Sequence, residues 1–263
     1  MERISLSPFD HTEVKNTLFE PRPKGTQQIS HYLADLSMPH IIYFAGERIG
    51  EDNPKLLAEG FNKQGINFTY IDPWTTATED EVSDKSELCS DILSTIPKFR
   101  QESKITGPAV IAGRGLGAAI ALELAVKWQR DILALIFESG LRNANSYISA
   151  HGLTPPETEH DPLNIIKNMR QFTKPVLFLH CSRDSVCPLT ELEWVVCESS
   201  SKSTQFQILP GDARFSIASM SEGYYFSIIK DFFNRVMGVR TKKISSRQER
   251  LRKKAKEKEK VEE

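Results

Sequence analysis

A glycine-rich stretch at residues 111–118 carries the strongest chemical signal in the sequence. Gly113, Gly115 and Gly117 join the end of an apolar run to the start of a helical pattern. Glycine permits a tight turn there, because it adopts backbone conformations that cost other residues ~1–3 kcal/mol. The first helical amide, that of Leu116, would then point at an anion or a polarised carbonyl placed at the helix start. The stretch therefore predicts a ligand-binding turn.

The same glycines also fit the fingerprint of dinucleotide-binding proteins, Gly-x-Gly-x-x-Gly/Ala, with Gly113, Gly115 and Ala118 at the fixed places. Glu138 ends the next apolar run 20 positions after Ala118, where a carboxylate would bind a ribose hydroxyl. Such a fingerprint normally lies on the first strand of its unit, whereas two strand–helix patterns precede this one. Dinucleotide binding is therefore the weaker interpretation.

Other side chains could act as nucleophiles, namely Ser139, Cys181 and Ser182, with His180 or His151 as the base. His180 and Cys181 are neighbours at the end of an apolar run, so their side chains should point to opposite faces of the strand. That is poor geometry for a nucleophile and its base. We expect these residues to be structural.

The sequence predicts no metal site and no cofactor. Its four cysteines have no zinc-ligand spacing, and Asp72, Asp80 and Asp84 have no metal-loop spacing. Most of the cysteines lie in or beside apolar patterns, so we expect them to be buried reduced thiols. They are Cys89, Cys181, Cys187 and Cys197.

The elements that must position these residues follow an alternating strand and helix pattern. Apolar runs predict six strands, at Ile41–Phe44, Asn67–Ile71, Pro108–Ala112, Ile132–Phe137, Val176–His180 and Thr204–Leu209. Helical patterns lie between and after them, at 53–64, 80–102, 116–130, 161–172, 189–200 and 216–237. Parallel strands need such crossovers. The fold class is therefore α/β, with a doubly wound, mostly parallel central sheet flanked by helices.

Composition sets the limits of this domain. The chain has 263 residues, 39% of them hydrophobic, which suits one α/β domain over residues 39–238. Residues 1–38 have no clear pattern, and we expect an irregular segment that joins the core. No uncharged apolar stretch is long enough for a transmembrane segment, and the amino end lacks a signal-peptide core. These patterns predict a cytoplasmic protein.

Residues 239–263 form a separate, charged tail. The segment Arg240–Glu263 holds 11 Lys or Arg residues against 5 Asp or Glu, while the formal charge of the whole chain is −1. It lacks an apolar stripe, so we expect a solvated helix or disorder. The alternative is a basic arm for nucleic acid or an anionic surface, although interleaved glutamates dilute its charge.

From about Phe9 to Phe233 the sequence resembles the α/β-hydrolase superfamily, in particular a bacterial-type branch. The glycine-rich turn resembles the nucleophile elbow Gly-x-Ser-x-Gly, with Gly115 in the place of the serine. Residues 39–47 resemble the strand and loop that supply half of the oxyanion hole. The resemblance implies the same fold and a pocket lined by backbone of Gly46, Glu47 and Leu116.

The resemblance also implies an incomplete catalytic triad. Asp184 matches the acid, and the turn after the last strand carries Arg214 where the histidine belongs. All six histidines precede Asp184, so the order Ser, Asp, His cannot be completed. Arginine has no acceptor lone pair and cannot take a proton from a nucleophile. We expect no catalytic residue at Gly115, Asp184 and Arg214, and hypothesise that Arg214 pairs with Asp184.

These features predict a non-catalytic α/β-hydrolase-fold protein, retained for binding a small-molecule ligand or for assembly. Residues 140–161 lie where such folds carry a small cap over the site. Three alternatives stay open. They are a hydrolase of small acyl or ester substrates with a displaced nucleophile, an interaction protein acting through the basic tail, and a dinucleotide-binding protein.

Overall fold

The computed structural model of the chain describes residues 15–18, 28–46, 53–72, 96–146, 161, 163–184, 187–212 and 222–238. The predicted tail at 239–263 and most of the predicted cap at 140–161 lie outside these residues. Within them, no helix combines the length and the apolar character needed to cross a membrane.

All six predicted strands are confirmed as neighbours in one sheet. Their bounds are β3 (His40–Phe44), β4 (Asn67–Asp72), β5 (Ala109–Arg114), β6 (Ile132–Glu138), β7 (Val176–Arg183) and β8 (Thr204–Asp212). They pair in parallel in the order β4-β3-β5-β6-β7-β8. A parallel sheet needs both faces covered, which explains why these runs are almost continuously apolar. The predicted fold class is thus confirmed.

Two further strands differ from the expectation of an irregular segment at residues 1–38. They are β1 (Lys15–Leu18) and β2 (Gln28–Tyr32), which extend the sheet beyond β4 by antiparallel pairing. Ile29 and Tyr32 are buried, but His31 and Ser30 interrupt the apolar pattern, so the sequence gives little sign of a strand. The described residues form an eight-stranded sheet.

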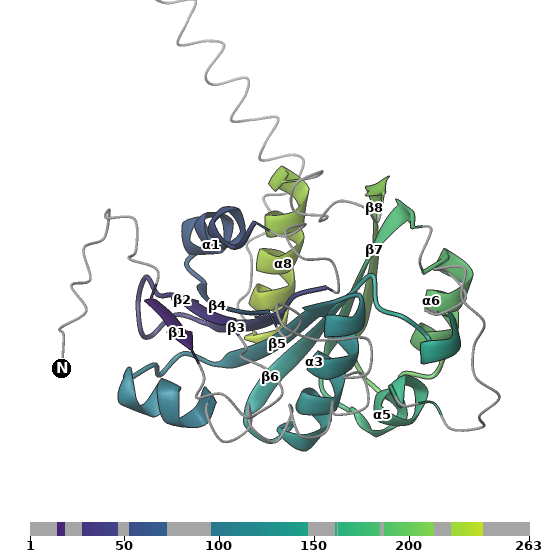
Figure 1. Cartoon of the computed structure of the whole chain (residues 1–263), viewed down its shortest axis with the longest axis horizontal. Coiled ribbons are helices and arrows are strands. Elements are labelled where there is room, and N and C mark those ends of the chain that lie inside the picture. Colours follow the sequence, from purple (N-terminus) through teal and green to yellow (C-terminus); the bar gives the residue numbers. More distant parts are fainter. Residues whose placement is uncertain are drawn as a thin grey trace, which may run out of the picture.

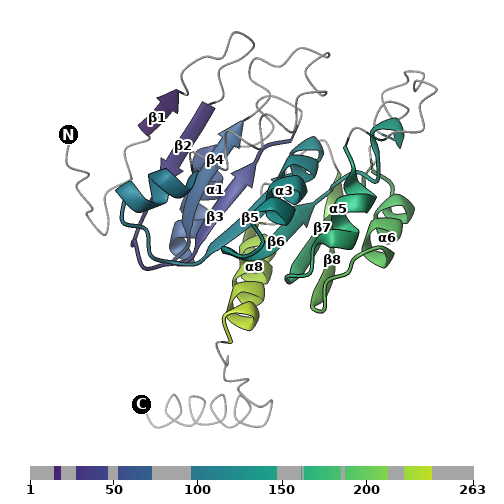
Figure 2. The same ribbon diagram turned by 90° about the horizontal axis from the view of Figure 1, so that it is seen from below.

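Helices cover both faces of the sheet, as the doubly wound prediction requires (Figure 1, Figure 2). On one face α3 (Leu116–Lys127), α5 (Ile165–Gln171) and α6 (Leu189–Cys197) pack on one set of strand residues, among them Phe137 and Phe178. On the other face α1 (Pro54–Lys63) and α8 (Glu222–Val236) pack on the alternate set. Period-two burial along each strand thus divides the core into two layers.

The helices begin and end close to the predicted limits. Asn53 caps α1, since its side chain accepts hydrogen bonds from the amides of Lys55 and Leu56. Of the helix predicted at 80–102, the structure describes residues 96–102, which are helical. The helix predicted at 161–172 is shorter, because Asn164 adopts a left-handed conformation immediately before α5.

Candidate functional site

The glycine-rich turn between β5 and α3 has the backbone geometry of a strained elbow. Gly115 adopts φ 54° and ψ −125°, outside the regions that side-chain-bearing residues prefer. Its amide donates a hydrogen bond of 3.0 Å to the carbonyl oxygen of Glu138 on β6. Helix α3 then begins at Leu116. The turn therefore holds residue 115 at the carboxyl edge of the sheet, on β5 between its neighbours β3 and β6.

The two flanking glycines are required by close backbone contacts. A Cβ atom on Gly113 would lie 2.3 Å from the carbonyl oxygen of Gly117, and a Cβ atom on Gly117 would lie 2.1 Å from that of Ala45. Neither contact is tolerable, and backbone atoms cannot rotate away. Gly113 and Gly117 thus let α3 sit directly on β5 and on the end of β3.

The structure brings the predicted oxyanion loop to the elbow. A Cβ atom on Gly46 would lie 3.6 Å from the carbonyl oxygen of Arg114, the residue before Gly115. Gly46 is buried and follows β3 by two residues. Glu47, the other predicted loop residue, lies outside the described residues. Of the predicted pocket backbone, Gly46 and Leu116 are therefore near the turn.

Asp184 follows β7 at the same edge of the sheet and is half-buried. Its Oδ1 atom accepts a hydrogen bond of 2.8 Å from the amide of Cys187, which orders the start of the loop toward α6. Arg214 lies outside the described residues. The pairing of Arg214 with Asp184 stays a prediction.

Two buried charges lie beside the elbow, and the sequence analysis did not bring them together: it named Glu138 as a candidate for binding ribose and did not name Arg114. Arg114 and Glu138 are partners in the β5–β6 register and are 6% and 1% exposed. The Oε2 atom of Glu138 accepts a hydrogen bond of 2.9 Å from the hydroxyl of Tyr225 on α8. An arginine at the end of an apolar run was the available signal for this pair. Tyr225 gave none, since it lies in an ordinary helical stripe.

The buried thiols are poor nucleophiles. Burial, followed by the nearby charge of Glu138, raises the pKa of Cys181 to about 12. Burial also raises the pKa of Cys187 far above its usual value, and its Sγ atom donates to the carbonyl oxygen of Gly140 at 3.0 Å. A thiolate is the reactive form of cysteine, so both residues are expected to be inert. The prediction of burial fails for Cys197, which is exposed at the end of α6.

His180 is fully buried and does not pair with a hydroxyl or a thiol. Leu179 and Cys181 belong to the core layer under α1 and α8, whereas Phe178 belongs to the opposite layer. Strand alternation therefore places His180 on the opposite face from Cys181. Burial lowers the pKa of His180, although the neighbouring charge of Asp184 opposes this.

The serine candidates differ in environment. Ser139 is 7% exposed and adopts φ 42°, an uncommon conformation for a residue with a side chain. It follows β6 directly, and its hydroxyl lies next to the Cys181 thiol. Ser182 is exposed on β7. His151, the other suggested base, lies outside the described residues.

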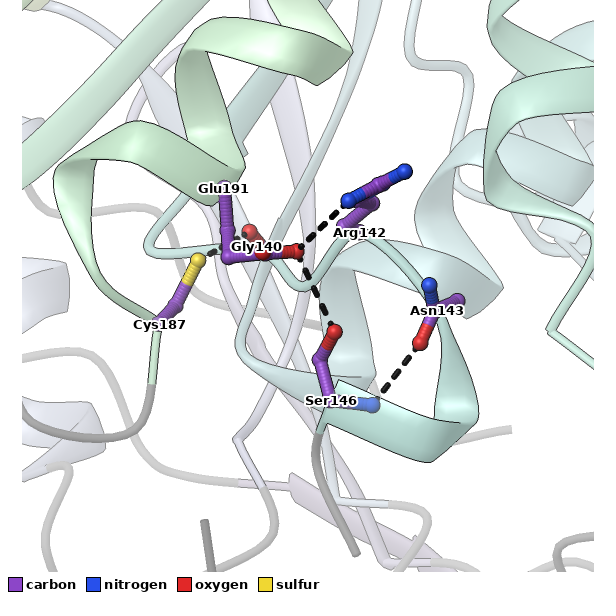
Figure 3. A network of polar contacts seen from close by, with 6 residues as sticks. All are labelled: Gly140, Arg142, Asn143, Ser146, Cys187 and Glu191. Carbon is purple, nitrogen blue, oxygen red and sulfur yellow. Dashed lines mark hydrogen bonds and ion pairs between the residues drawn. The ribbon is translucent and has the colours of Figure 1, made fainter. Parts of the chain in front are cut away.

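Polar contacts fix the segment after β6 onto the start of α6 (Figure 3). The Oε2 atom of Glu191 lies 3.5 Å from Nη1 of Arg142 and accepts a hydrogen bond of 3.2 Å from the Ser146 hydroxyl. The guanidinium of Arg142 also stacks over the ring of Trp194, 5.1 Å from its centroid. The contact between Cys187 and Gly140 lies in the same cluster. These contacts fix the described residues 140–146 onto the start of α6.

Asp161 ties the two ends of the segment 147–160 together. Its Oδ1 atom accepts hydrogen bonds from the amide of Ala144 at 3.0 Å and from the amide of Leu163 at 3.1 Å. One carboxylate thus joins the backbone before the segment to the backbone after it.

Within the described parts of the chain, no three His, Cys, Asp or Glu side chains come together in a way that could hold a metal ion. The dinucleotide interpretation also loses support, because β5 is the third parallel strand in chain order and not the first.

No protein-family model matches the sequence, and no curated protein matches it. Solved structures, however, are similar. Est1E from Butyrivibrio proteoclasticus superimposes with a TM-score of 0.64 at 15% identity, covering 85% of this chain and 99% of that one. The esterase Pf2001 from Pyrococcus furiosus gives 0.62 at 14% identity, with 85% and 90% covered. The esterase domain of a Rhodothermus marinus protein gives 0.63 at 13% identity, with 85% and 99% covered.

These identities support a conclusion about architecture. The eight-stranded sheet, the elbow after β5 and the similarity to esterases agree with one another. This chain has the α/β-hydrolase fold.

Proposed function

We propose that this protein binds a small carbonyl- or carboxylate-bearing molecule at the elbow and does not hydrolyse it through residue 115. The observation that carries the proposal is the conformation of Gly115, which has elbow geometry but no side-chain atom that could attack a carbonyl. The turn is thus retained while the chemistry normally performed there lacks its nucleophile.

Retention of the turn supports binding. Gly113 and Gly117 each sit against backbone where a Cβ atom would clash, so the tight β5–α3 junction depends on them. The amino end of α3 carries the positive end of a helix dipole, which favours an oxygen with negative charge. Gly46 lies beside the same junction. The raised pKa values of the Cys181 and Cys187 thiols argue against either sulfur as a substitute nucleophile.

Restoration of the missing groups tests this proposal. We would compare the parent, the double variant Gly115→Ser/Arg214→His and the matched control Gly115→Ala/Arg214→His with p-nitrophenyl butyrate. The control carries the same backbone strain but no hydroxyl. We expect turnover only in the serine variant, and binding of butyrate to the parent by ligand-observed NMR. Turnover by the parent, or absence of butyrate binding, would contradict the proposal.

A second function is a hydrolase of small acyl or ester substrates with a displaced nucleophile. The comparisons favour it more directly than they favour loss of activity, because the three structures named above are esterases by name. Ser139 is the described residue that suits it best, since it is buried, has a positive φ and follows the strand next to the elbow. Its Oγ atom would attack the acyl carbon, the bond between that carbon and the alkoxy oxygen would break, and the serine proton would pass to the departing alkoxide to give the alcohol. Water would then hydrolyse the acyl-serine ester to give the acid and the free serine.

Ser139→Ala distinguishes the two functions. If Ser139 is the nucleophile, this variant loses parent turnover of p-nitrophenyl butyrate, by about 10³-fold or more as for other lost nucleophiles. Ser182→Ala is the matched control, because Ser182 is an exposed serine on the neighbouring strand β7. Equal activity of parent and Ser139→Ala would exclude this role for Ser139.

The remaining predictions concern residues outside the described parts of the chain. We propose a cap within residues 140–161 and a cytoplasmic location. A basic arm at Arg240–Glu263 for nucleic acid or an anionic surface is a further proposal. Salt-sensitive binding to such partners should be lost when the chain is truncated after residue 239. If the truncated chain keeps all of this binding, the arm is not the binding segment.

A further inference from the structure

A chain of polar side chains crosses the amino-terminal end of the sheet, far along the strands from the elbow. Nη1 of Arg100 lies 2.8 Å from Nδ1 of His40, and Nε2 of His40 lies 2.7 Å from Oγ1 of Thr69. Nδ1 of His31 lies 2.9 Å from the same oxygen. Arg100 comes from the helix at 96–102, whereas the other three residues come from β3, β4 and β2. Four elements thus meet in one network.

The donors and acceptors fix the charge state of His40. A guanidinium only donates hydrogen bonds, so Nδ1 of His40 must be an acceptor without a proton. Nε2 then carries the ring proton and donates to Thr69. A second proton on His40 would point an N–H group at the guanidinium of Arg100. The contact therefore exists only while His40 is neutral.

The described residues around this network shield His40 from solvent. His40 is fully buried, and His31 stacks on Phe99 with ring centroids 3.6 Å apart. Burial lowers the pKa of His40 well below its usual value, and the charges of Arg100 and His31 add to this effect. Among the described residues, Arg100 and His31 are the charged or titratable groups that act on His40. On the same helix, Lys98 and Glu102 pair with each other at the exposed surface.

Arg100 also fixes the loop that leads into β5. Its Nη2 atom donates to the carbonyl oxygen of Gly107 at 2.5 Å. The amides of Thr106 and Gly107 donate to the carbonyl oxygen of Leu36, at 2.8 and 3.1 Å. Ile96 and Ile105 are buried, and Ile96 packs in the core layer. The rest of the segment 96–108 is held by the Arg100 guanidinium, by the stacking of Phe99 on His31 and by backbone contacts.

We propose that Arg100, His40, Thr69 and His31 form an acid-sensitive latch, which releases residues 96–108 when Nδ1 of His40 takes up a proton. The proton comes from solvent, the Arg100–His40 hydrogen bond breaks, and the buried imidazolium then repels the half-buried guanidinium of Arg100. We expect β6 and β7 to stay folded, because they are not neighbours of β2 or β4 in the sheet and lie beyond β5 from this network. The latch is independent of any chemistry at the elbow.

Hydrogen exchange at several pH values, corrected for intrinsic rates, tests the latch in the full chain. Opening linked to the uptake of one proton becomes about tenfold more favourable per pH unit below about 6.5. We expect amides 96–108 to lose protection by this factor while those of β6 and β7 do not. Unchanged protection of 96–108 down to about pH 5, or equal loss across the sheet, would overturn the proposal.

His40→Gln is the decisive variant, because its amide can accept or donate a hydrogen bond but does not titrate. We expect the acid-dependent step of its 96–108 segment to be smaller than in the parent, because only His31, which stacks on Phe99, still titrates there. His180→Gln is the matched control, since it removes another fully buried histidine and should keep the step. The reverse pattern would overturn the latch. If His40→Gln does not fold, ¹⁵N NMR of the parent decides: a His40 with a proton on Nδ1 at neutral pH contradicts the assignment.

Discussion

The two ends of the central strands differ in the hydrogen bonding, charge and backbone conformation of their buried polar residues. At the amino ends, Arg100, His40 and Thr69 form hydrogen bonds of good length, without positive φ at any of the three. At the carboxyl ends, Gly115 and Ser139 both have positive φ, and two charged side chains are buried beside them. Strain and buried charge cost stability, and at this edge they lie where open α/β sheets bind ligands. The contrast supports the proposal that the carboxyl edge binds the ligand.

The largest effect is expected from a substitution that disrupts the β5–α3 junction at the carboxyl edge of the sheet. Gly117→Ala places a Cβ atom 2.1 Å from the backbone oxygen of Ala45, so we expect the free energy of unfolding to fall by about 3 kcal/mol or more. Urea denaturation measures this. The control is Gly223→Ala in α8, where a Cβ atom meets nothing within 4 Å, and which should be neutral or slightly stabilising. Similar losses in both variants would mean that the contact does not matter.

Acid should weaken the amino-terminal network first. Burial lowers the pKa of His31 from 6.5 to about 4, so the folded state keeps this imidazole neutral while the unfolded chain takes up a proton. Its contribution is complete above about pH 6.5 and is lost as the pH falls toward about 4, at about 1.4 kcal/mol per pH unit. We expect His31→Gln to flatten the slope of unfolding free energy between about pH 6.5 and 5. An unchanged slope would contradict the assignment.

Tyr225→Phe should have a smaller effect. It removes the donor to Oε2 of buried Glu138, which we expect to cost about 1.5 kcal/mol in the free energy of unfolding. Tyr224→Phe is the matched control, because Tyr224 is the neighbouring tyrosine of α8 and is 74% exposed. If the two variants are equally stable, the contact between Glu138 and Tyr225 carries little energy.

The smallest effect sharpens the strain argument. Gly115→Ser puts a side chain at φ 54°, so we expect a loss of about 1 kcal/mol and a melting temperature lower by about 2–4 °C. Ser139→Gly removes a side chain at φ 42° and should shift the melting temperature the other way. A Gly115→Ser variant that melts at or above the parent temperature would refute the strain.

The sequence predicted the parallel core well because the strands are buried on both faces. Continuous runs such as those of β6 and β7 can be recognised without knowledge of their partners. The antiparallel strand β2 was missed because Ser30 and His31 are polar, and His31 depends on Thr69 and on the helix at 96–102 for its environment. That environment is assembled only in the folded chain.

The candidate site likewise has a part that the sequence predicted and a part that it did not. The elbow at Gly115 was predictable because glycine spacing records backbone conformation directly. The pairing of Glu138 with Tyr225 was not, since 87 residues separate them and Tyr225 has no distinctive local pattern. Sequence patterns thus predicted where the chain turns and missed which side chains meet there.

Asp161 gives the fold a modular boundary. Because its carboxylate bonds the amides of Ala144 and Leu163, the chain leaves the core and returns to it at one point. Loop-closure entropy grows slowly with length, so an insert between two fixed, adjacent ends can be exchanged at little cost to the rest of the domain. We therefore expect a change in chain length between these two fixed ends to cost the sheet little stability.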